Sequence, residues 1–340
     1  MSEDAAWDFC FEKLAQVSRS FALPISFLDD KTKNPVALSY LLCRMVDCIE
    51  DAPYLPHSQR DALYEGFRRF LRGDEDGSFF KKEKIAFASL SPAEQDLMSN
   101  ATTVGKAWNS LSADARMVLR PWIQEMAFGM QIFNHRTPKE GFRVLENLND
   151  LHRYCYYVAG TVGHLLTEFF AFAYAFDARR KNELKADAEN FALGLQLTNI
   201  LKDVAEDHAR GMIFIPKTNW RRQNLDPANL LFAENRPAAH EAIRPIFEMA
   251  EDALAGGLTY LTNLPVENAA PRLFCGIPLL MAVATLAEAK NNDAQFEKEI
   301  KVKISRNFTA NIVNHCRDNI SNNDALSRAF DRLKNQKSLT

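Results

Sequence analysis

The stretch "YLLCRMVDCIEDAP" (residues 40–53) is an apolar segment that ends in three acids. Its polar residues follow one another at spacings of three and four, so on an α-helix they form one stripe. The stripe consists of Tyr40, Arg44, Asp47 and Asp51, and Glu50 flanks it. The other positions are mostly apolar, which is typical of a helix that is buried on nearly every side. Carboxylates at a helix C-terminus face the negative end of the helix dipole, so we expect a positively charged ligand beside them.

A second stretch, "LGLQLTNILKDVAEDHARG" (residues 193–211), repeats this design. Its polar stripe consists of Gln196, Asn199, Asp203 and either Glu206 or Asp207. Two carboxylates about 6 Å apart repel by roughly 3 kcal/mol at an effective dielectric constant near 20, so a cavity lined by both stripes needs cations. Oxygen ligands without His or Cys favour Mg²⁺, which commonly bridges carboxylates to phosphates. The spacing alone leaves a solvated acidic surface as an equal alternative.

Composition and charge exclude several classes of protein. The chain has 340 residues, a formal net charge of −3 and 47% hydrophobic residues, so it can form a large core and lacks the basic character of nucleic-acid binders. The six cysteines have no CxxC spacing, which argues against a zinc site or a disulfide framework and favours a reducing cytoplasm. There is no signal peptide, and no run reaches the roughly 18 apolar residues of a membrane span.

The pattern predicts one all-α domain over residues 1–340. We expect a helix from Asn34-Pro35 to just before Pro53, since Pro is favoured in the first turn of a helix. The other expected helices cover about 3–17, 57–72, 91–134 with a break near Pro121, 147–177, 183–209, 238–263, 270–291 and 306–335. From about residue 322 the sequence becomes a polar C-terminal tail, and we expect no membrane anchor there.

Four segments together resemble the squalene/phytoene synthase family, in the order and at about the spacing found there. They are "VSRSFA" (17–22), "YLLCRMVDCIED" (40–51), "YCYYVAGTVG" (154–163) and "LQLTNILKDVAED" (195–207). The resemblance covers nearly the whole chain. It implies the helical isoprenoid-synthase fold, with a central cavity lined by the two Asp-rich helices.

Two later segments are similar to the squalene-forming branch of that family, which carries a basic segment for NADPH. They are "FCGIPLLMAVATLAE" (274–288) and "VKISR" (302–306), the second less basic than in relatives. The resemblance then implies a farnesyltransferase that condenses two farnesyl diphosphates head to head, with Mg²⁺, to presqualene diphosphate. Reduction by NADPH would give squalene. We expect a monomer in the cytoplasm, with peripheral membrane contact for release of the product and no nucleic-acid partner.

The resemblance also assigns roles to individual residues. Metal and diphosphate binding falls to Asp47, Glu50, Asp51, Asn199, Asp203 and Asp207, with Glu206 as a supporting acid. Substrate contacts fall to Ser18, Arg19, Ser20, Phe21, Tyr40, Arg44, Gln196, Asn199 and Lys202, the last of which replaces an Arg of many relatives. Tyr154 is the catalytic residue of the first half-reaction, Phe274, Cys275 and Pro278 line the pocket of the second, and Lys303 and Arg306 contact NADPH. The small residues Ala159, Gly160 and Gly163 are expected to leave room for prenyl chains.

Three other functions stay open from the sequence. A reductant-free synthase of phytoene or dehydrosqualene would lack the 302–306 segment. A terpene cyclase also pairs Asp-rich helices but uses one diphosphate substrate. A helical scaffold without activity would not need its aspartates or Tyr154.

Overall fold

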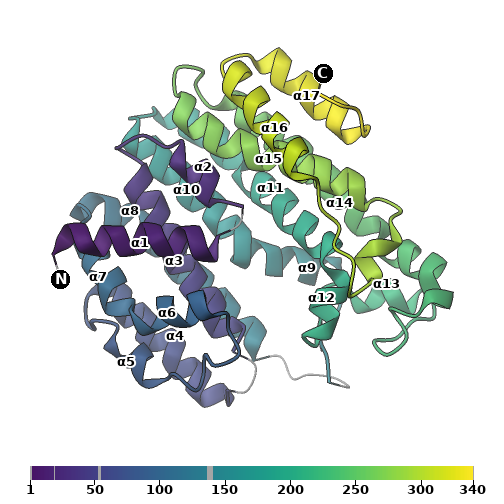
Figure 1. Ribbon diagram of the computed structural model, residues 1–340, viewed down its shortest axis with the longest axis horizontal. Coiled ribbons are helices and arrows are strands. Elements are labelled where there is room, and N and C mark those ends of the chain that lie inside the picture. The colour runs from purple at the N-terminus through teal and green to yellow at the C-terminus, as the bar shows by residue number, and fades with distance from the viewer. Residues whose placement is uncertain (1, 19, 53–54, 136–140, 340) are drawn as a thin grey trace. The chain divides into compact units, whose positions relative to one another are not determined.

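The computed structural model describes residues 2–18, 20–52, 55–135 and 141–339. Helices form nearly all of the regular structure in these ranges (Figure 1). The two strands, β1 (Arg143–Val144) and β2 (Met212–Ile213), pair in parallel over two residues each. The predicted all-α class is therefore confirmed.

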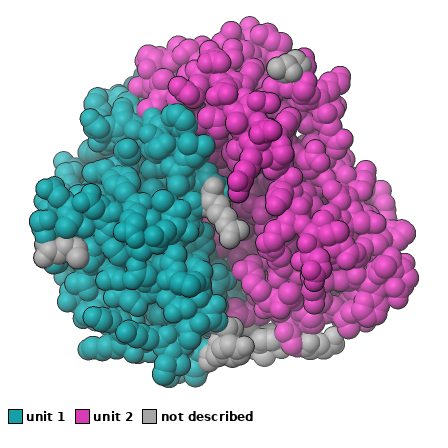
Figure 2. Space-filling view, in the orientation of Figure 1, with its two compact units in different colours: residues 1–135, 164–181 teal, residues 136–163, 182–340 magenta. Residues whose placement is uncertain are grey.

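The residue contacts divide the chain into two compact units (Figure 2). Unit 1 comprises residues 1–135 and 164–181, and unit 2 comprises residues 136–163 and 182–340. The first acidic stripe belongs to unit 1 and the second to unit 2. That the two units form one domain stays a prediction.

Unit 1 is built around α3, which is buried along most of its length. Its helices are α1 (Glu3–Val17), α2 (Ala22–Ser26), α3 (Lys33–Glu50), α4 (His57–Arg72), α5 (Ser78–Lys82), α6 (Pro92–Ser99), α7 (Ala101–Ser110), α8 (Ala113–Asn134) and, from residue 164 on, α10 (Thr161–Ala173). Helices α1, α6 and α8 all pack against α3. The apolar positions Leu38, Leu41 and Met45 of α3 are completely buried, as the apolar pattern around its polar stripe predicts.

Two predicted helix boundaries in unit 1 are wrong. Helix α3 begins at Lys33, after Thr32, rather than at Asn34-Pro35. The first backbone N–H that bonds within the helix is that of Val36, so Pro35 still lies where no N–H is needed. The predicted helix over 91–134 is three helices, and Pro121 lies inside α8 without ending it. Its exposed position leaves the carbonyl that it releases open to water.

Unit 2 contains the remaining helices and the two strands. Its helical elements are α9 (Leu148–Cys155), the π-helical η1 (Tyr156–Gly160), α11 (Ala178–Lys202) from residue 182 on, α12 (Val204–Ala209), α13 (Lys217–Arg221), η2 (Ala233–Asn235), α14 (Arg236–Asn263), α15 (Ala269–Ala289), η3 (Asp293–Phe296), α16 (Arg306–Asn319) and α17 (Asn323–Lys334). Helix α17 lies within the stretch predicted to be a polar tail, and it packs its apolar side on α15.

Helix α15 packs against α14, α16 and α17 in unit 2 (Figure 1). Among the described residues it is the helix long and apolar enough to cross a membrane, which corrects the sequence prediction that no such stretch exists. Its most apolar window is, however, 67% buried within the protein, as in the core helix of a globular unit. The guanidinium of the buried Arg272 donates to the backbone oxygens of Leu261 at 2.9 Å and Ile320 at 2.7 Å. It thereby links α15 to α14 and to the end of α16.

All six cysteines are buried and free. This agrees with the prediction that they are small core residues.

Candidate active site

The first polar stripe forms a connected group on α3. The Arg44 guanidinium donates from Nη2 to the Tyr40 hydroxyl at 3.2 Å, and its Nη1 lies 3.5 Å from Oδ2 of Asp47. The Tyr40 hydroxyl in turn donates to the backbone oxygen of Val17 at 3.4 Å. Three of the predicted site residues therefore lie together, with a cation beside the first aspartate.

Glu94 belongs to the same group, although the sequence analysis did not single it out. Its Oε1 lies 3.8 Å from Nη1 of Arg44. Glu94 is also the third residue of α6, where it forms a capping box with Ser91. The pattern Ser-x-x-Glu before a helix predicts such a cap. The sequence therefore accounts for Glu94 as a capping residue and gives no sign of its contact with Arg44.

Burial changes the acidity of the first aspartate. Burial raises the pKa of Asp47 against the opposing charge of Arg44, and with the smaller contributions of Asp51 and Glu94 the pKa lies at about 7. The Asp47 side chain nevertheless keeps 29% of its surface exposed. A cation can therefore reach this carboxyl group, and binding it would displace the proton that the fold otherwise favours.

The other acids of the first motif lie at the end of α3. Glu50 is half-buried, and Asp51 is exposed at the C-cap. The backbone oxygen of Ala52 accepts a hydrogen bond from the buried guanidinium of Arg60. The end of the motif is therefore fixed by a cation from α4, where the helix dipole favours positive charge.

The segment before α2 supplies the remaining predicted contacts of unit 1. The buried Ser18 accepts the backbone N–H groups of Phe21 at 3.0 Å and Ala22 at 3.1 Å, so its hydroxyl oxygen shapes the turn into α2. The Phe21 ring lies 5.9 Å from that of Tyr40, and Ser20 is exposed. Arg19 lies outside the described residues.

The second acidic motif is broken by a change of backbone direction, so the predicted single helix over 183–209 is wrong. Helix α11 ends at Lys202, and Asp203, with φ −110° and ψ 20°, is the N-cap of α12. Asp tolerates such backbone because its side chain competes with helical hydrogen bonding, but the Asp203 carboxylate makes no capping bond and pairs with Lys202. Before the break, Gln196 is half-buried and Asn199 is exposed.

Each acid of the second motif has its own cation. Asp203 pairs with Lys202, Asp207 with Arg210, and Glu206 with Lys301. The Lys301 contact, from a segment about 95 residues further along the chain, was not predicted. The hydrogen bond from Lys301 lowers the pKa of Glu206. Burial raises the pKa of Asp207 to about 6, against the opposing effect of Arg210.

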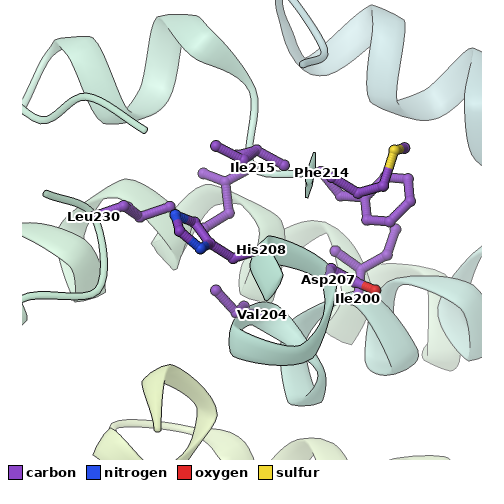
Figure 3. Close-up of a pocket in the computed structure, with 9 residues that line it drawn as sticks. Ile200, Val204, Asp207, His208, Phe214, Ile215 and Leu230 are labelled. Atoms are coloured by element: carbon purple, nitrogen blue, oxygen red, sulfur yellow. The ribbon is translucent and has the colours of Figure 1, made fainter. Parts of the chain in front are cut away.

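A small pocket in unit 2 reaches this motif. It is lined by Ile200, Val204, Asp207, His208, Met212, Ile213, Phe214, Ile215 and Leu230. Figure 3 shows Asp207 on the side of Phe214 and His208 on the side of Leu230. The His208 Nε2 lies 2.7 Å from the backbone oxygen of Pro227, which indicates a structural role for this ring.

Tyr154 lies next to the same pocket. It is 6% exposed, near the end of α9, and its ring centroid is 4.8 Å from that of Phe214. The π-helical turn η1 follows directly, and such turns often occur at functional sites. Asp207 lines this pocket, and Tyr154 packs against Phe214, which also lines it. Both residues therefore lie beside the same apolar side chains of unit 2.

The other predicted residues of unit 2 differ in exposure. Phe274, Cys275 and Pro278 are buried in α15, where they are part of the core. Lys303 and Arg306 are exposed, in the segment before α16 and in its first residue.

The described acids do not form a complete metal cage by themselves. Among the described residues, no group of three or more His, Cys, Asp or Glu side chains is close enough to hold a metal ion. Mg²⁺ commonly takes one or two carboxylates and fills its other positions with water and substrate phosphate. The oxygen-only donor set of Asp47 or of Asp207 fits that mode of binding.

Comparison with known proteins gives a consistent result. Residues 14–307 match the family model described as squalene/phytoene synthase. Human squalene synthase is 29% identical over 296 residues, covering 86% of this chain and 66% of the relative. Squalene synthase of Eremothecium gossypii is 31% identical over 299 residues, covering 86% of this chain and 64% of the relative. The chain thus spans slightly under two thirds of these relatives' length.

Solved structures show the same fold. The structure described as TcSQS with the ligand BPH1237 has a TM-score of 0.77 and 26% identity, and the match covers 98% of this chain and 99% of that chain. A dehydrosqualene synthase structure has a TM-score of 0.64 at 17% identity, over 93% of this chain and 96% of that chain, which is likeness in fold alone. The predicted isoprenoid-synthase fold is confirmed.

Proposed function

This chain belongs to the squalene/phytoene synthase family, and we propose that it condenses two farnesyl diphosphates head to head and reduces the product to squalene. The observation that carries the proposal is the guanidinium of Arg44 beside Asp47, bonded to the Tyr40 hydroxyl, at the end of a buried helix. This arrangement suits a diphosphate next to a cation-binding carboxylate. The 26% identity with a squalene synthase structure over 98% of the chain supports the choice of substrate.

We propose that Asp47 and Asp51, and separately Asn199, Asp203 and Asp207, hold Mg²⁺, with Glu50 and Glu206 as supporting acids. The raised pKa values of Asp47 and Asp207 support this assignment, because a partly desolvated carboxylate binds a cation in place of its proton. When bound, Mg²⁺ supplies positive charge that stabilises a leaving diphosphate.

The cationic side chains would orient the diphosphates. Arg44 can donate to phosphate oxygens through its guanidinium, whose Nε has no hydrogen-bond partner among the described residues. Lys202 and Arg210 stand beside Asp203 and Asp207 and can neutralise a second diphosphate. Lys202 provides a point charge rather than the fork of an arginine.

Tyr154 would act where water is scarce. The residue is buried against Phe214, and exclusion of water protects an allylic cation from conversion to an alcohol. A neutral phenol with a pKa near 10 is a weak base. We therefore propose that Tyr154 passes the proton lost in cyclopropane formation to the released diphosphate.

Reduction is the part of the proposal that separates squalene synthase from a reductant-free relative. Lys303 and Arg306 are exposed beside the N-terminus of α16, where positive charge and helix dipole both favour the phosphates of NADPH. The apolar product would pass to a membrane, so peripheral membrane contact is part of the proposal, as is a monomeric cytoplasmic enzyme.

A product assay tests the function. Purified protein with farnesyl diphosphate and Mg²⁺ is incubated with and without NADPH, and the extracted hydrocarbons are identified by mass spectrometry. We expect squalene only with NADPH and none with EDTA. Dehydrosqualene as the main product with NADPH present, or phytoene from geranylgeranyl diphosphate, would replace the proposal with a reductant-free synthase. A cyclic product from one farnesyl unit would indicate a terpene cyclase.

A further inference from the structure

The environment of Arg44 on α3 contains one carboxylate that the proposed function does not use. The guanidinium has Asp47 at 3.5 Å, Glu94 at 3.8 Å and the Tyr40 hydroxyl at 3.2 Å. Its Nε is buried and has no hydrogen-bond partner among the described residues. Both Nη atoms of Arg44 are thus engaged, and its buried Nε is a donor without a partner among the described residues.

Glu94 is itself fixed in place. Its Oε2 accepts the backbone N–H of Ser91 at 3.0 Å and the Ser91 hydroxyl at 2.7 Å. These bonds form the capping box of α6, and they leave Oε1 for Arg44. Asp47 differs, because it is the side chain proposed to bind a cation. Once Asp47 does so, Glu94 is the carboxylate that still accompanies Arg44.

We propose that Glu94 is a positioning residue that holds Arg44 in the orientation that receives a substrate diphosphate. The inference rests on the proposed function for the identity of the ligand. Two effects of Glu94 oppose each other: its charge repels a nearby anion, and its contact pre-orients the guanidinium. Because Glu94 Oε1 is 3.8 Å from Nη1 and its other oxygen is fixed in the α6 cap, we expect orientation to dominate.

The variant Glu94→Gln separates these effects. Gln also forms a capping box at this position, so α6 keeps its first turn while the charge is lost. We expect the Kd of inorganic diphosphate with Mg²⁺, measured by calorimetry, to rise about tenfold, the usual effect of removing a supporting contact. The KM for farnesyl diphosphate should rise by a similar factor, with kcat changed less than twofold. Unchanged or tighter diphosphate binding would overturn the proposal.

A double-mutant cycle tests whether Glu94 acts through Arg44. In an Arg44→Gln background, Glu94→Gln should change the Kd of diphosphate less than twofold. If Glu94→Gln still raises the Kd of diphosphate tenfold in the Arg44→Gln background, Glu94 does not act by positioning Arg44. If Glu94→Gln instead raises the Mg²⁺ concentration required and leaves KM unchanged, Glu94 is a metal ligand and the positioning role is refuted.

Asp96→Asn is the matched control. Asp96 lies on the same helix and pairs with Lys13 at 2.7 Å, and Lys13 keeps Glu12 at 3.1 Å and Gln16 at 2.8 Å. The Asp96→Asn variant loses the same charge as Glu94→Gln and should leave the Kd of diphosphate within twofold of the wild-type value. If wild-type protein binds diphosphate but makes no squalene, the proposed function fails, and the Kd of diphosphate for Glu94→Gln alone decides the inference. If wild type makes squalene and Glu94→Gln matches it in Kd and KM, the inference alone fails.

Discussion

Replacing Gly163 by alanine tests the close approach of α10 and α11 within unit 2. A Cβ atom at this position would lie 2.4 Å from the backbone oxygen of Ala188 and 3.1 Å from its carbonyl carbon. The obstacle is backbone, which cannot rotate away as a side chain can. Gly163 is one of the small residues that were predicted to leave room for a prenyl chain, but the backbone of α11 occupies the space beside it.

The expected magnitude follows from two opposing contributions. Alanine gains up to about 1 kcal/mol over glycine inside a helix, and overpacking costs about 1–3 kcal/mol. With a backbone atom at 2.4 Å we expect the upper end of that range or more, so the free energy of unfolding should fall by about 2 kcal/mol. Gly160→Ala is the matched control, because its Cβ would meet only side chains, Tyr156 Cδ2 at 3.1 Å and Glu189 Cγ at 3.4 Å.

Thermal unfolding by circular dichroism measures the difference. Each kcal/mol shifts Tm by about 2–4 °C in domains of 150–250 residues, so the two variants should differ by about 4–8 °C. If Gly163→Ala unfolds within about 1 °C of Gly160→Ala, the approach of the two helices is not as tight as the structure shows. A Gly163→Ala protein of normal stability that has lost activity would instead support the role in making room for substrate.

The other predictions concern the acids and the thiols. Asp47→Ala and Asp203→Ala should each nearly abolish squalene formation while the circular dichroism spectrum stays that of wild type; substantial residual turnover would contradict the metal assignment. Asp207→Asn should also stop turnover, yet in EDTA at pH 8 it should raise the free energy of unfolding by up to about 3 kcal/mol, since the folded pKa of about 6 exceeds the ordinary 3.8. The wild type therefore loses stability as pH rises from about 4 through 6, and a variant with no gain in denaturant midpoint at pH 8 would refute this. Burial raises the pKa of Cys10 and Cys316 to about 12, and all six thiols are buried, so folded protein should not react with a thiol reagent at pH 8, whereas six thiols should react in denaturant. Fast labelling of the folded protein would count against the core assignment. Since the folded thiols resist ionisation, their contribution to the free energy of unfolding is present below about pH 9 and is lost as pH rises from about 9 through 12.

Helical periodicity was sufficient to predict the first motif. Tyr40, Arg44 and Asp47 are separated by three or four residues, and such neighbours meet on any regular helix without knowledge of the rest of the fold. The buried character of α3 could be predicted for the same reason, since apolar residues cover most of its circumference.

The contacts made by other parts of the chain could not be predicted in this way. Glu94 reaches Arg44 from α6, and Lys301 reaches Glu206 from the segment before α16. The sequence around Glu94 is accounted for by a helix cap, and Lys301 is an ordinary exposed lysine. Only the three-dimensional path of the chain brings Glu94 to Arg44 and Lys301 to Glu206. The break at Asp203 was missed because the apolar pattern continues across it, and periodicity does not report a single residue with altered backbone angles.

That break matters to anyone who would transplant the second motif into a designed protein. Asp203 has left helical geometry, with φ −110° and ψ 20°, and α12 has only the six residues Val204–Ala209. In an uninterrupted helix of the same sequence, Asp207 would point in a different direction relative to Asn199 than it does here. A faithful graft must copy the corner as well as the spacing, together with β2, which follows and packs against α12.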